Sequence, residues 1–497
     1  MQMRNLAFRG LRLPRLGAMM RSGGFSPETL FAGGIAGAWF DPSDLSTLFK
    51  DSAGTTPVTT AGQPVGLMLD KSGRTNHAVQ TTVAARPMYQ TSPARATLDK
   101  VDDRLLVTVP TGGFTGTMVL ATDQGTASYG VNIPAGPYDI GSKGGLYFPG
   151  NAIVGQVIRN GALSEGESAG IEAYFVENGA TASYGAVTNF GSFWRAWTEL
   201  TSFPLIDTSS GTNFSATWFN CNRLTSFSPI DTSAGTTFSY AWYNCNRLTS
   251  FNLIDTSSGT NFLAAWQSCS SLTSFPPIDT SSGTVFQQAW ENCSSLTTFP
   301  LIDTSAGTNF RNAWRSCTSL TTFPLIDTSA GTDFGYAWLN CSSLTSFPLI
   351  DTSAGTYFGH AWRSCTSLTT FPLIDTSAGT NFYQAWFNCS SITSFPLIDT
   401  SAGTNFRQAW FNCSSITTIP AGLFDNIKGG DFNDAFANTA LTQTSIDNIL
   451  VSLVASGIAA GTRVFDQSGG SAPSSTGEAA IDTLRSRGWT VTVTGGY

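Results

Sequence analysis

The sequence predicts an α/β solenoid of nine 24-residue repeats, joined to a small mainly-β, sandwich-like domain that precedes it. Parallel strands are expected on the concave side of the solenoid and short helices on its convex side. Three observations predict this class. The chain matches itself at a 24-residue offset from Leu200 to Ser415. Within each repeat, apolar residues follow first a helical and then an extended spacing. Before the repeats, short apolar runs at 64–70, 104–110, 117–123, 129–134, 145–149 and 152–161 alternate with Gly, Pro and Asn turns and predict short strands.

Each repeat approximates L-T-S-F-P-L-I-D-T-S-A-G-T-x-F-x-x-A-W-x-N-C-S-S. The stretches "DTSAGTNFYQAWFNCSSIT" (375–393) and "DTSAGTNFRQAWFNCSSIT" (399–417) part at the residue after the shared Phe, which is Tyr383 in one and Arg407 in the other. A function must therefore explain a constant framework that carries a few changing positions.

A short helix is expected in the second half of each unit. Phe214, Thr217, Trp218 and Cys221 fall at i, i+3, i+4 and i+7, which is one stripe of a helix. Thr212 precedes them as a candidate N-cap.

An extended segment is expected to follow the helix. It contains Leu224, Phe227 and Ile230. Most later units place Pro after the strand Phe, as at Pro276 and Pro300, which removes a ladder donor and keeps the strand short.

A single unit cannot fold alone. It buries about six apolar side chains at roughly 1.5 to 3 kcal/mol each, against roughly 1 to 2 kcal/mol of backbone ordering for each residue. Stacking supplies the missing burial. Because packed helices need about 8 to 10 Å and strands about 4.8 Å, the stack is expected to curve.

Atypical units are expected at both ends of the repeats. Residues 181–199 keep the register but carry Trp197 where later units have Cys, and they are predicted to form an N-terminal cap. Residues 416–497 are predicted to form a C-terminal cap with Phe436 in the place of Trp. Beyond Phe436 the patterns predict helix, strand, helix and strand, with a capping box from Ser475 to Glu478.

The front of the chain divides into two parts. Residues 1–35 form a basic attachment arm, with five arginines and no acidic residue before Glu28. Residues 36–180 form the β domain. Its first helix is expected to open at Asp41 as N-cap with Pro42 at the first position, and a second is expected from Ser164 to Gly179.

The charge balance excludes some classes of partner. Charged residues make up 12 % of the chain, the net charge is −8 and the pI is near 4.8. A nucleic-acid-binding protein needs a clustered basic face, so no nucleic acid is expected as a partner. Arginines interrupt every apolar stretch of the arm, so no membrane insertion is expected.

The repeated Cys and Asp residues are expected to be structural. All nine cysteines, Cys221 to Cys413, occupy one register. On adjacent helices they would lie beyond disulfide reach, which predicts free buried thiols. The repeated Asp opens D-T-S-x-G-T and is expected to accept a backbone N–H two residues on. A bound cation remains an alternative for this Asp row and catalysis a remote one. We expect no catalytic residue, metal, cofactor or enzymatic activity.

The changing positions are the candidate site. They are the residue before the repeat Phe, the two after it and the one after Trp, and they are expected to point outward from the helix. Tyr, Phe, Arg, Gln and Asn dominate them, which is the composition of binding surfaces; relaxed constraint after unit duplication is the alternative. The candidate ligand-binding residues are Phe219, Tyr240, Tyr243, Gln267, Gln288, Arg311, Arg315, Tyr336, Tyr357, His360, Arg363, Tyr383, Gln384, Phe387, Arg407, Gln408 and Phe411.

The repeats resemble the leucine-rich repeats of BspA-like bacterial surface proteins. The resemblance rests on the D-T-S turn and on "F-x-x-C-S-S-L-T-S" and covers about 190–497. It implies a leucine-rich-repeat solenoid used for adhesion or host contact. This chain departs from the family in its Trp before the Cys and in its 24-residue period.

Residues 36–90, "GAWFDPSDLSTLFKDSAGTTPVTTAGQPVGLMLDKSGRTNHAVQ" in their first part, resemble a module of tail proteins from tailed bacteriophages. In that family the module often continues into a laminin-G-like sandwich, which residues up to about 180 match loosely. The "LDKVDDRLLV" segment lacks the Phe and Gly of the sandwich entry, so no sugar or calcium site is carried over.

Together these resemblances imply a receptor-binding protein of a bacteriophage virion, in a tail fibre or spike. It would be assembled in the host bacterial cytoplasm. Residues 1–35 are expected to bind other tail or baseplate proteins, and the helical face is expected to bind a host cell-surface glycan or protein; homo-oligomerisation stays open. The alternatives are a prophage-encoded bacterial surface adhesin and a purely structural virion protein.

Overall fold

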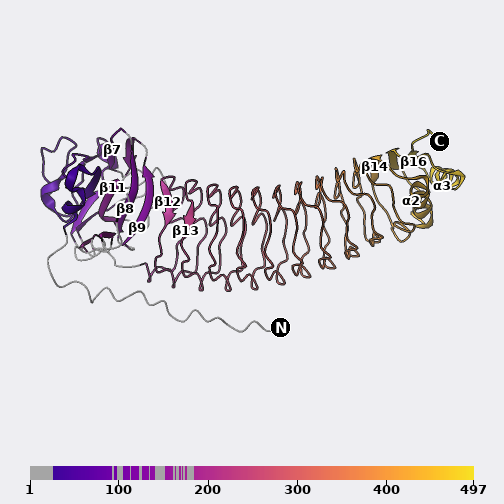
Figure 1. Cartoon of the computed structure of the whole chain (residues 1–497), viewed down its shortest axis with the longest axis horizontal. Coiled ribbons are helices and arrows are strands. Elements are labelled where there is room, and N and C mark those ends of the chain that lie inside the picture. Colours follow the sequence, from indigo (N-terminus) through magenta and orange to yellow (C-terminus); the bar gives the residue numbers. More distant parts are fainter. Residues whose placement is uncertain are drawn as a thin grey trace.

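The computed structural model describes residues 26–91, 94–97, 105–111, 113–122, 126–133, 135–139, 152–160, 163, 167–168, 171, 174–175 and 184–497. Strands and turns dominate it and helices are few. A β-rich front part leads into a long row of coils, and a small unit with helices α2(Gln443–Ala455) and α3(Ser475–Ser486) closes the far end (Figure 1).

Two sheets build the front part. The first sheet runs in the order β13(Ser226–Phe227), β12(Leu200–Phe203), β9(Thr126–Ile133), β8(Phe114–Thr122), β11(Ala152–Asn160), β6(Ala94–Thr97) and β5(Met88–Thr91), with β1(Gly37–Phe40) also paired to β11. The second runs in the order β10(Gly136–Asp139), β7(Leu106–Val109), β4(Ala78–Val79), β3(Leu67–Met68) and β2(Leu48–Phe49). Side chains of both sheets, such as Met118 and Val107, share one apolar core.

The short strands expected at 104–110, 117–123, 129–134 and 152–161 are present as β7, β8, β9 and β11. The helix expected to open at Asp41 is not. Asp41 follows strand β1, and the only helical turn nearby is the 3-10 segment η3(Leu45–Thr47), which Asp44 caps by accepting from the Ser46 N–H at 3.2 Å. Asp41 is instead a buried carboxylate that accepts from Ser43.

The boundary of the basic arm is also corrected. Residues 27–34, placed in the arm by the sequence, form the 3-10 segment η2(Pro27–Gly34). Leu30 and Phe31 in it are buried with Trp39 and Val157, because their apolar side chains complete a small core on the first sheet. Residues 1–25, the expected strand at 145–149 and most of the expected helix from 164 to 179 lie outside the described residues.

The front part and the repeats share a sheet rather than forming separate units. Strand β12, from the first repeat, pairs antiparallel with β9 and parallel with β13. Arg223 donates from Nη1 to the Asn132 carbonyl at 2.9 Å across this junction. Trp197, which stands in the N-terminal cap where later units have Cys, packs against Tyr129 of β9 with ring centroids 4.9 Å apart.

The 24-residue units lie one on another as a row of coils (Figure 1). Parallel bridges join residues 24 apart, from Asn189–Asn213 through successive units to Asn381–Asn405. The buried rings of each coil stack on their equivalents in the next: Trp242 and Trp266 lie 5.4 Å apart and almost parallel. These contacts bury completely the residues equivalent to Phe214, Trp218, Cys221 and Leu224 in every unit.

The predicted helices of the repeats are absent, which corrects the α/β part of the fold prediction. Residues 212–222 and their equivalents form successive tight turns. In the first unit Thr217 N–H donates to Phe214 O and Cys221 N–H donates to Trp218 O, both across three residues. Every second N–H group instead bonds to the next coil. Phe214 N–H donates to Thr237 O and Trp218 N–H to Ala241 O of the next coil.

Left-handed residues make this path possible. Ala216 has a φ of 53° and Asn220 a φ of 59°, and the equivalent residues of every unit repeat these values. A left-handed residue after each turn directs the next N–H toward the neighbouring coil, so the helical ladder of i to i−4 bonds cannot form. Along this segment one N–H group donates within its own coil and the next donates to the neighbouring coil. The backbone hydrogen bonds are thus satisfied without a helix.

The absence of helices removes the expected reason for strong curvature. On the turn side, the ring centroids of Phe286 and Phe310 are 5.5 Å apart; on the extended side, those of Phe299 and Phe323 are 5.9 Å apart. Neither row approaches the 8 to 10 Å that helices need. The row of coils accordingly bends only gently (Figure 1).

The cysteines are free and buried, as predicted. The expected cause, the wide separation of helices, is wrong because there are no helices. Cys221 Sγ instead donates to the Trp194 carbonyl of the preceding unit at 3.0 Å, and later cysteines repeat the contact. Burial raises the pKa of Cys221, Cys269, Cys341 and Cys413 to about 12, so these groups remain protonated thiols.

The repeated Asp has the predicted turn function. Asp303 Oδ1 accepts from the Ser305 N–H at 3.0 Å and from the Ser305 hydroxyl at 2.7 Å, and the aspartate of every unit accepts the same N–H. Thr212 is not an N-cap. Its hydroxyl donates to the Thr188 carbonyl of the preceding unit at 3.1 Å and so links coils rather than beginning a helix.

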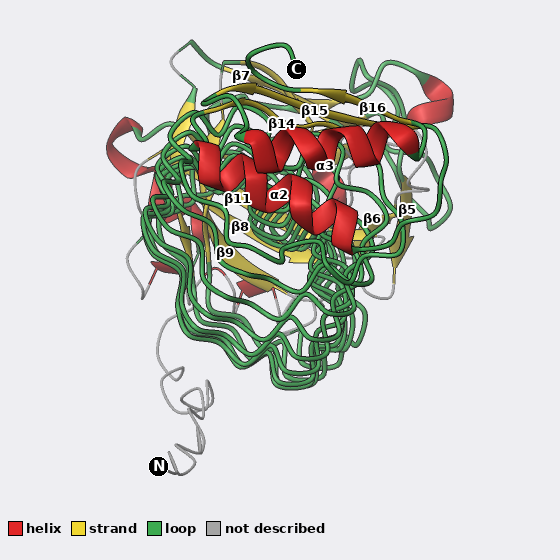
Figure 2. Ribbon diagram, turned by 90° about the vertical axis from the view of Figure 1, so that its right-hand side faces the viewer, coloured by secondary structure: helices red, strands yellow, loops and turns green. Residues whose placement is uncertain are grey.

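The last coil forms its inter-coil hydrogen bonds with a terminal unit. In that unit helix, strand, helix and strand follow Phe436 in the predicted order. Strand β14(Phe432–Thr439) pairs with β15(Arg463–Gly469), which pairs with β16(Trp489–Thr492), all parallel. Helices α2(Gln443–Ala455) and α3(Ser475–Ser486) cover this end of the row (Figure 2). Phe436 stacks on Trp410 with centroids 4.9 Å apart, as its place in the register predicts.

Candidate recognition face

The turn side of the coils carries three rows of outward residues, which we call the variable face. In the first unit the rows begin with Ser215, Ala216 and Phe219. Phe214 and Trp218 between them are fully buried, so the rows and the buried stripe alternate on the same segment. The tight turns within each coil recur every four residues, which produces this alternation.

The position before the repeat Phe, expected to vary freely, has a structural task in most units. Asn213 Oδ1 accepts from the Ser215 N–H at 2.9 Å. Asn or Asp makes the same turn at 189, 261, 309, 333, 381, 405 and 431. Only three rows therefore vary without a local backbone constraint of this kind.

The row that begins with Ala216 is left-handed throughout, yet it never contains glycine. Its members are Ala216, Tyr240, Ala264, Gln288, Asn312, Tyr336, His360, Gln384 and Gln408, with φ between 51° and 61°. A non-glycine residue in this region costs roughly 1 to 2 kcal/mol. The coils hold these residues in the left-handed conformation in spite of that cost, with Ala264, His360 and Gln384 buried and the others at least partly exposed.

Aromatic side chains stack along the first units of the face. Phe219 and Tyr243 are parallel, with centroids 4.6 Å apart. Tyr240 meets Tyr243 edge on, and the Arg195 guanidinium lies 4.6 Å from the centre of the Phe219 ring. The result is a continuous aromatic strip with a cation at one end.

A buried carboxylate organises the middle units. Glu291 is 4 % exposed. Its Oε2 accepts from Gln267 Nε2 and from Gln288 Nε2, each at 2.9 Å. Its Oε1 lies 3.3 Å from Arg315 Nη1. Four residues from three units thus form one closed polar group, which satisfies a carboxylate that would otherwise be costly to bury.

The richest group lies on the later units. Tyr336 and His360 stack with centroids 4.3 Å apart. Tyr383 meets His360 edge on at 4.9 Å. Arg311 lies over Tyr336 at 5.1 Å and pairs with Asp333 at 3.6 Å. These residues combine flat rings with a planar cation in one continuous patch.

The charge state of His360 follows from this setting. His360 is 7 % exposed. Burial first, and then the charges of Arg363, Arg311 and Arg315, lower its pKa to about 4. The imidazole is therefore neutral at pH 7.

Two glycines make room for Tyr357. A Cβ at Gly335 would lie 2.7 Å from the Tyr357 ring, and a Cβ at Gly359 would lie 2.8 Å from its hydroxyl oxygen. Both glycines stand at the position where other units carry Ser, Leu, Gln, Tyr or Arg. The Tyr357 ring consequently fills the space that side chains at positions 335 and 359 would need.

The last group joins Arg363 to the end of the face. Arg363 donates from Nη1 to Gln384 Oε1 and lies 4.6 Å from the centre of the Phe387 ring. Phe387 stacks on Phe411 with centroids 5.0 Å apart. Gln384 in turn donates to Gln408.

Sixteen of the seventeen candidate residues belong to the three rows of the variable face, and Tyr357 stands beside them at the position before the repeat Phe; they do not meet at one point. They form three groups along it: an aromatic strip, a polar group around Glu291, and a mixed group from Arg311 to Phe411. Tyr240, 36 % exposed, and Arg407 are exposed, while His360 and Gln384 are buried and the others are half-buried. Most candidates therefore pack against their equivalents in adjacent units instead of extending into solvent.

Sequence reasoning missed several contributors. Asp333 and Arg195 were not among the candidates, and Glu291 was recognised as a changing position but not as a candidate ligand-binding residue, although all three supply charge to the groups. The two glycines beside Tyr357 were also missed. Both glycines can be seen in the sequence, because they stand where other units carry a larger residue. Their effect on Tyr357 could not be seen, because it depends on which positions of adjacent units lie side by side.

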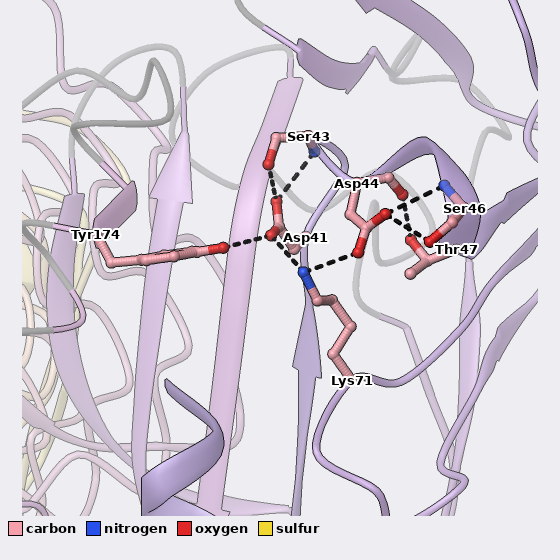
Figure 3. Close-up of polar contacts among 7 residues, drawn as sticks. All are labelled: Asp41, Ser43, Asp44, Ser46, Thr47, Lys71 and Tyr174. Carbon is pink, nitrogen blue, oxygen red and sulfur yellow. Dashed lines mark hydrogen bonds and ion pairs between the residues drawn. The ribbon is translucent and has the colours of Figure 1, made fainter. Parts of the chain in front are cut away.

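A separate polar cluster lies in the front part (Figure 3). Lys71 Nζ lies 2.9 Å from Asp41 Oδ2 and 3.0 Å from Asp44 Oδ2. Tyr174 donates its hydroxyl proton to Asp41 at 2.7 Å. Burial lowers the pKa of Lys71, but the two carboxylates outweigh burial and raise it overall. A protonated, fully paired lysine is no nucleophile, so the cluster ties η3, Lys71 and Tyr174 together.

The described part of the chain shows no group of three or more His, Cys, Asp or Glu that could ligate a metal. Within the same residues, no helix combines the length and apolarity needed to cross a bilayer. Comparison with models of known protein families gave no match, and comparison with curated proteins gave none either.

Proposed function

We propose that the chain is a receptor-binding protein of a bacteriophage tail fibre or spike. In this proposal the 24-residue units form a leucine-rich-repeat-like solenoid whose variable face binds a glycan or protein on the host cell surface. The front part and residues 1–25 attach the chain to other virion proteins. The single observation that carries the proposal is the variable face itself, a constant coil that presents changing Tyr, Phe, Arg and Gln side chains.

The left-handed row supports a task beyond folding. Gly is the residue that relieves strain at positive φ, yet none of the nine positions of that row has it. Strain held by a rigid surround is typical of functional sites. Tyr240, Tyr336 and His360 occur in this row and contribute to the aromatic groups described above.

The chemistry of the face suits sugars or polar protein surfaces. Aromatic faces stack on apolar sugar or side-chain planes, while guanidinium and amide groups donate hydrogen bonds. The mixed group offers both: the Tyr336–His360 stack, Tyr383, and Arg311 above the ring of Tyr336.

The test uses the full chain, labelled with a fluorophore, and bacteria that adsorb the phage. We expect saturable binding to the cells, competition with phage adsorption, and at least a tenfold loss of affinity when Tyr240, Tyr243, Tyr336 and Tyr383 are replaced by Ala, since four ring contacts at roughly 0.5 to 1.5 kcal/mol each are removed. A matched control replaces the exposed Thr249, Thr273, Thr321 and Thr369 of the extended side by Ala. Equal binding by the two variants would exclude the variable face as receptor site.

One observation favours a purely structural virion protein instead. Many polar groups on the variable face already have partners in adjacent units, as around Glu291. If this is their whole role, the tyrosine variant will show a lower Tm and no change in adsorption. The receptor proposal predicts the opposite for Tyr240, which is the most exposed of the four: its replacement by Ala should reduce adsorption and leave the Tm nearly unchanged.

A further inference from the structure

The extended side of the coils carries an exposed apolar row that the proposed function does not use. Leu301, Leu325, Leu349, Leu373 and Leu397 are between 51 % and 67 % exposed. They belong to five consecutive units, whose adjacent Phe rings are 5.5 to 6.1 Å apart. At a spacing of roughly 5 Å, five leucines form a ridge about 20 Å long. A continuous exposed apolar row of this kind marks an interaction surface.

An acidic row runs beside the leucines. Each leucine is followed two residues later by an exposed aspartate, from Asp303 to Asp399, and only a buried Ile separates the two. Asp327 Oδ1 accepts from Ser329, and the other aspartates are held in the same way, so the carboxylates keep one register. We call these ten residues the Leu–Asp ridge. It suits a partner that is both apolar and basic.

The chain has one segment of that composition. Residues 1–25 contain Arg4, Arg9, Arg12, Arg15 and Arg21, no acidic residue, and leucine, methionine and phenylalanine between the arginines. A second Leu–Asp ridge is a poorer occupant, because pairing two copies would bring like-charged aspartate rows together.

The lengths agree as well. Arg9, Arg12 and Arg15 are three residues apart, and three extended residues span roughly 9 to 10 Å. Two steps of the aspartate row span nearly the same distance. The described chain begins at Ser26, and the 11 to 17 residues from there back to Arg15 and Arg9 span up to roughly 35 to 60 Å when extended. Asp327 to Asp375 lie five to seven units beyond Asp207, which is roughly 25 to 35 Å along the coils, so this stretch of the arm is long enough to follow the coils to the ridge.

We propose that residues 1–25 dock on the Leu–Asp ridge of their own copy, with arginines on the aspartates and apolar side chains on the leucines. This interaction is independent of receptor binding. An arm held on the ridge is withdrawn from other partners until a competing surface displaces it.

The test measures tryptic cleavage after Arg9, Arg12 and Arg15 in the folded full chain by mass spectrometry. Wild type is compared with D327N/D351N/D375N, in which Asn preserves the turn acceptor and removes the charge, and with L325S/L349S/L373S. We expect both variants to be cut at least about tenfold faster than wild type, because cleavage follows the undocked population. Adding 0.5 M salt should accelerate cleavage of wild type. The control T321S/T345S/T369S should be cut as slowly as wild type, and circular dichroism should show the same Tm for all folded variants.

A second measurement identifies the occupant. Leu11→Cys can be labelled alone with a maleimide photo-crosslinker, because the native cysteines are buried. We expect crosslinks within one copy to peptides that carry the ridge. Equal cleavage rates in wild type and ridge variants, crosslinks to the variable face, or crosslinks formed only between copies would each overturn the proposal.

Discussion

Tyr336 and His360 stack ring on ring, 4.3 Å apart, although each occupies a left-handed backbone position. The same coil spacing that aligns the buried tryptophans aligns these outward rings. A histidine held neutral by burial and by three arginines makes the stability of this region depend on pH.

Acidification should weaken the fold through His360. Its folded pKa is about 4 and its ordinary value is 6.5, so the unfolded chain takes up the proton first. The contribution is fully present above pH 6.5 and is lost as the pH falls from 6.5 toward 4. We expect the Tm of wild type to fall more steeply over this range than that of H360Q, whose Gln occurs at the same position in Gln384 and Gln408. Parallel pH profiles of Tm would exclude the effect.

Replacing a left-handed alanine by glycine should stabilise the chain. Ala216 has a φ of 53° and is only half-buried. Relief of roughly 1 to 2 kcal/mol of strain outweighs the roughly 0.5 to 1 kcal/mol entropic cost of glycine, so A216G should gain up to about 1 kcal/mol in chemical denaturation. The control A241G removes a buried methyl at an ordinary φ and should lose about 1 to 2 kcal/mol. If A216G destabilises as much as A241G, left-handed strain is not significant here.

Neutralising Glu291 should cost more than neutralising Asp333. In E291Q, Gln267 and Gln288 lose charge-assisted bonds to a carboxylate that is 4 % exposed. We expect a loss of about 1.5 to 3 kcal/mol in the free energy of unfolding. D333N keeps the turn that Asn makes at 309 and 381 and breaks only the half-exposed pair with Arg311, so it should cost less than about 1 kcal/mol. A reversed order would show that the Glu291 group contributes little.

The cysteines should be unreactive in the folded chain and reactive after unfolding. Each is fully buried with a raised pKa. A thiol reagent at pH 8 should detect essentially no cysteine in native protein and all nine in denaturant. Because the unfolded thiols ionise near 9 and the folded ones near 12, stability should also decline as the pH rises from 9. Fast labelling of native protein would contradict the packing of the coils.

The sequence predicts the stacking of units and the inward stripe, but not the local backbone. Two tight turns with a left-handed residue at every fourth position bury i, i+3, i+4 and i+7, as a helix does. The distinguishing features were present at other positions of the repeat. Asn or Asp before the repeat Phe makes a turn, and Asn, which tolerates the left-handed region, stands at the position of Asn220 in most units.

The outward placement of the candidate residues was likewise predictable, whereas their mutual packing was not. Phe219 stacks on Tyr243, and Gln267 bonds Glu291, because side chains 24 residues apart lie one coil step apart. Helical spacing would have left these side chains too far apart to stack. Because a helix was predicted for this segment, side chains that pack against one another in adjacent coils were expected to be free.

The bonds between coils give the molecule a net electrical direction. The N–H groups of Phe214, Ala216, Trp218 and Asn220 donate to the following coil, whereas those of Thr212 and Thr225 donate to the preceding one. Because the forward bonds outnumber the backward ones, their dipoles do not cancel as they nearly do in an ordinary sheet. The positive end lies toward α2 and α3, opposite in sense to an α-helix. There the Asp466 carboxylate accepts from the Asp434 N–H, so an anion built into the chain sits where this field is most favourable to it.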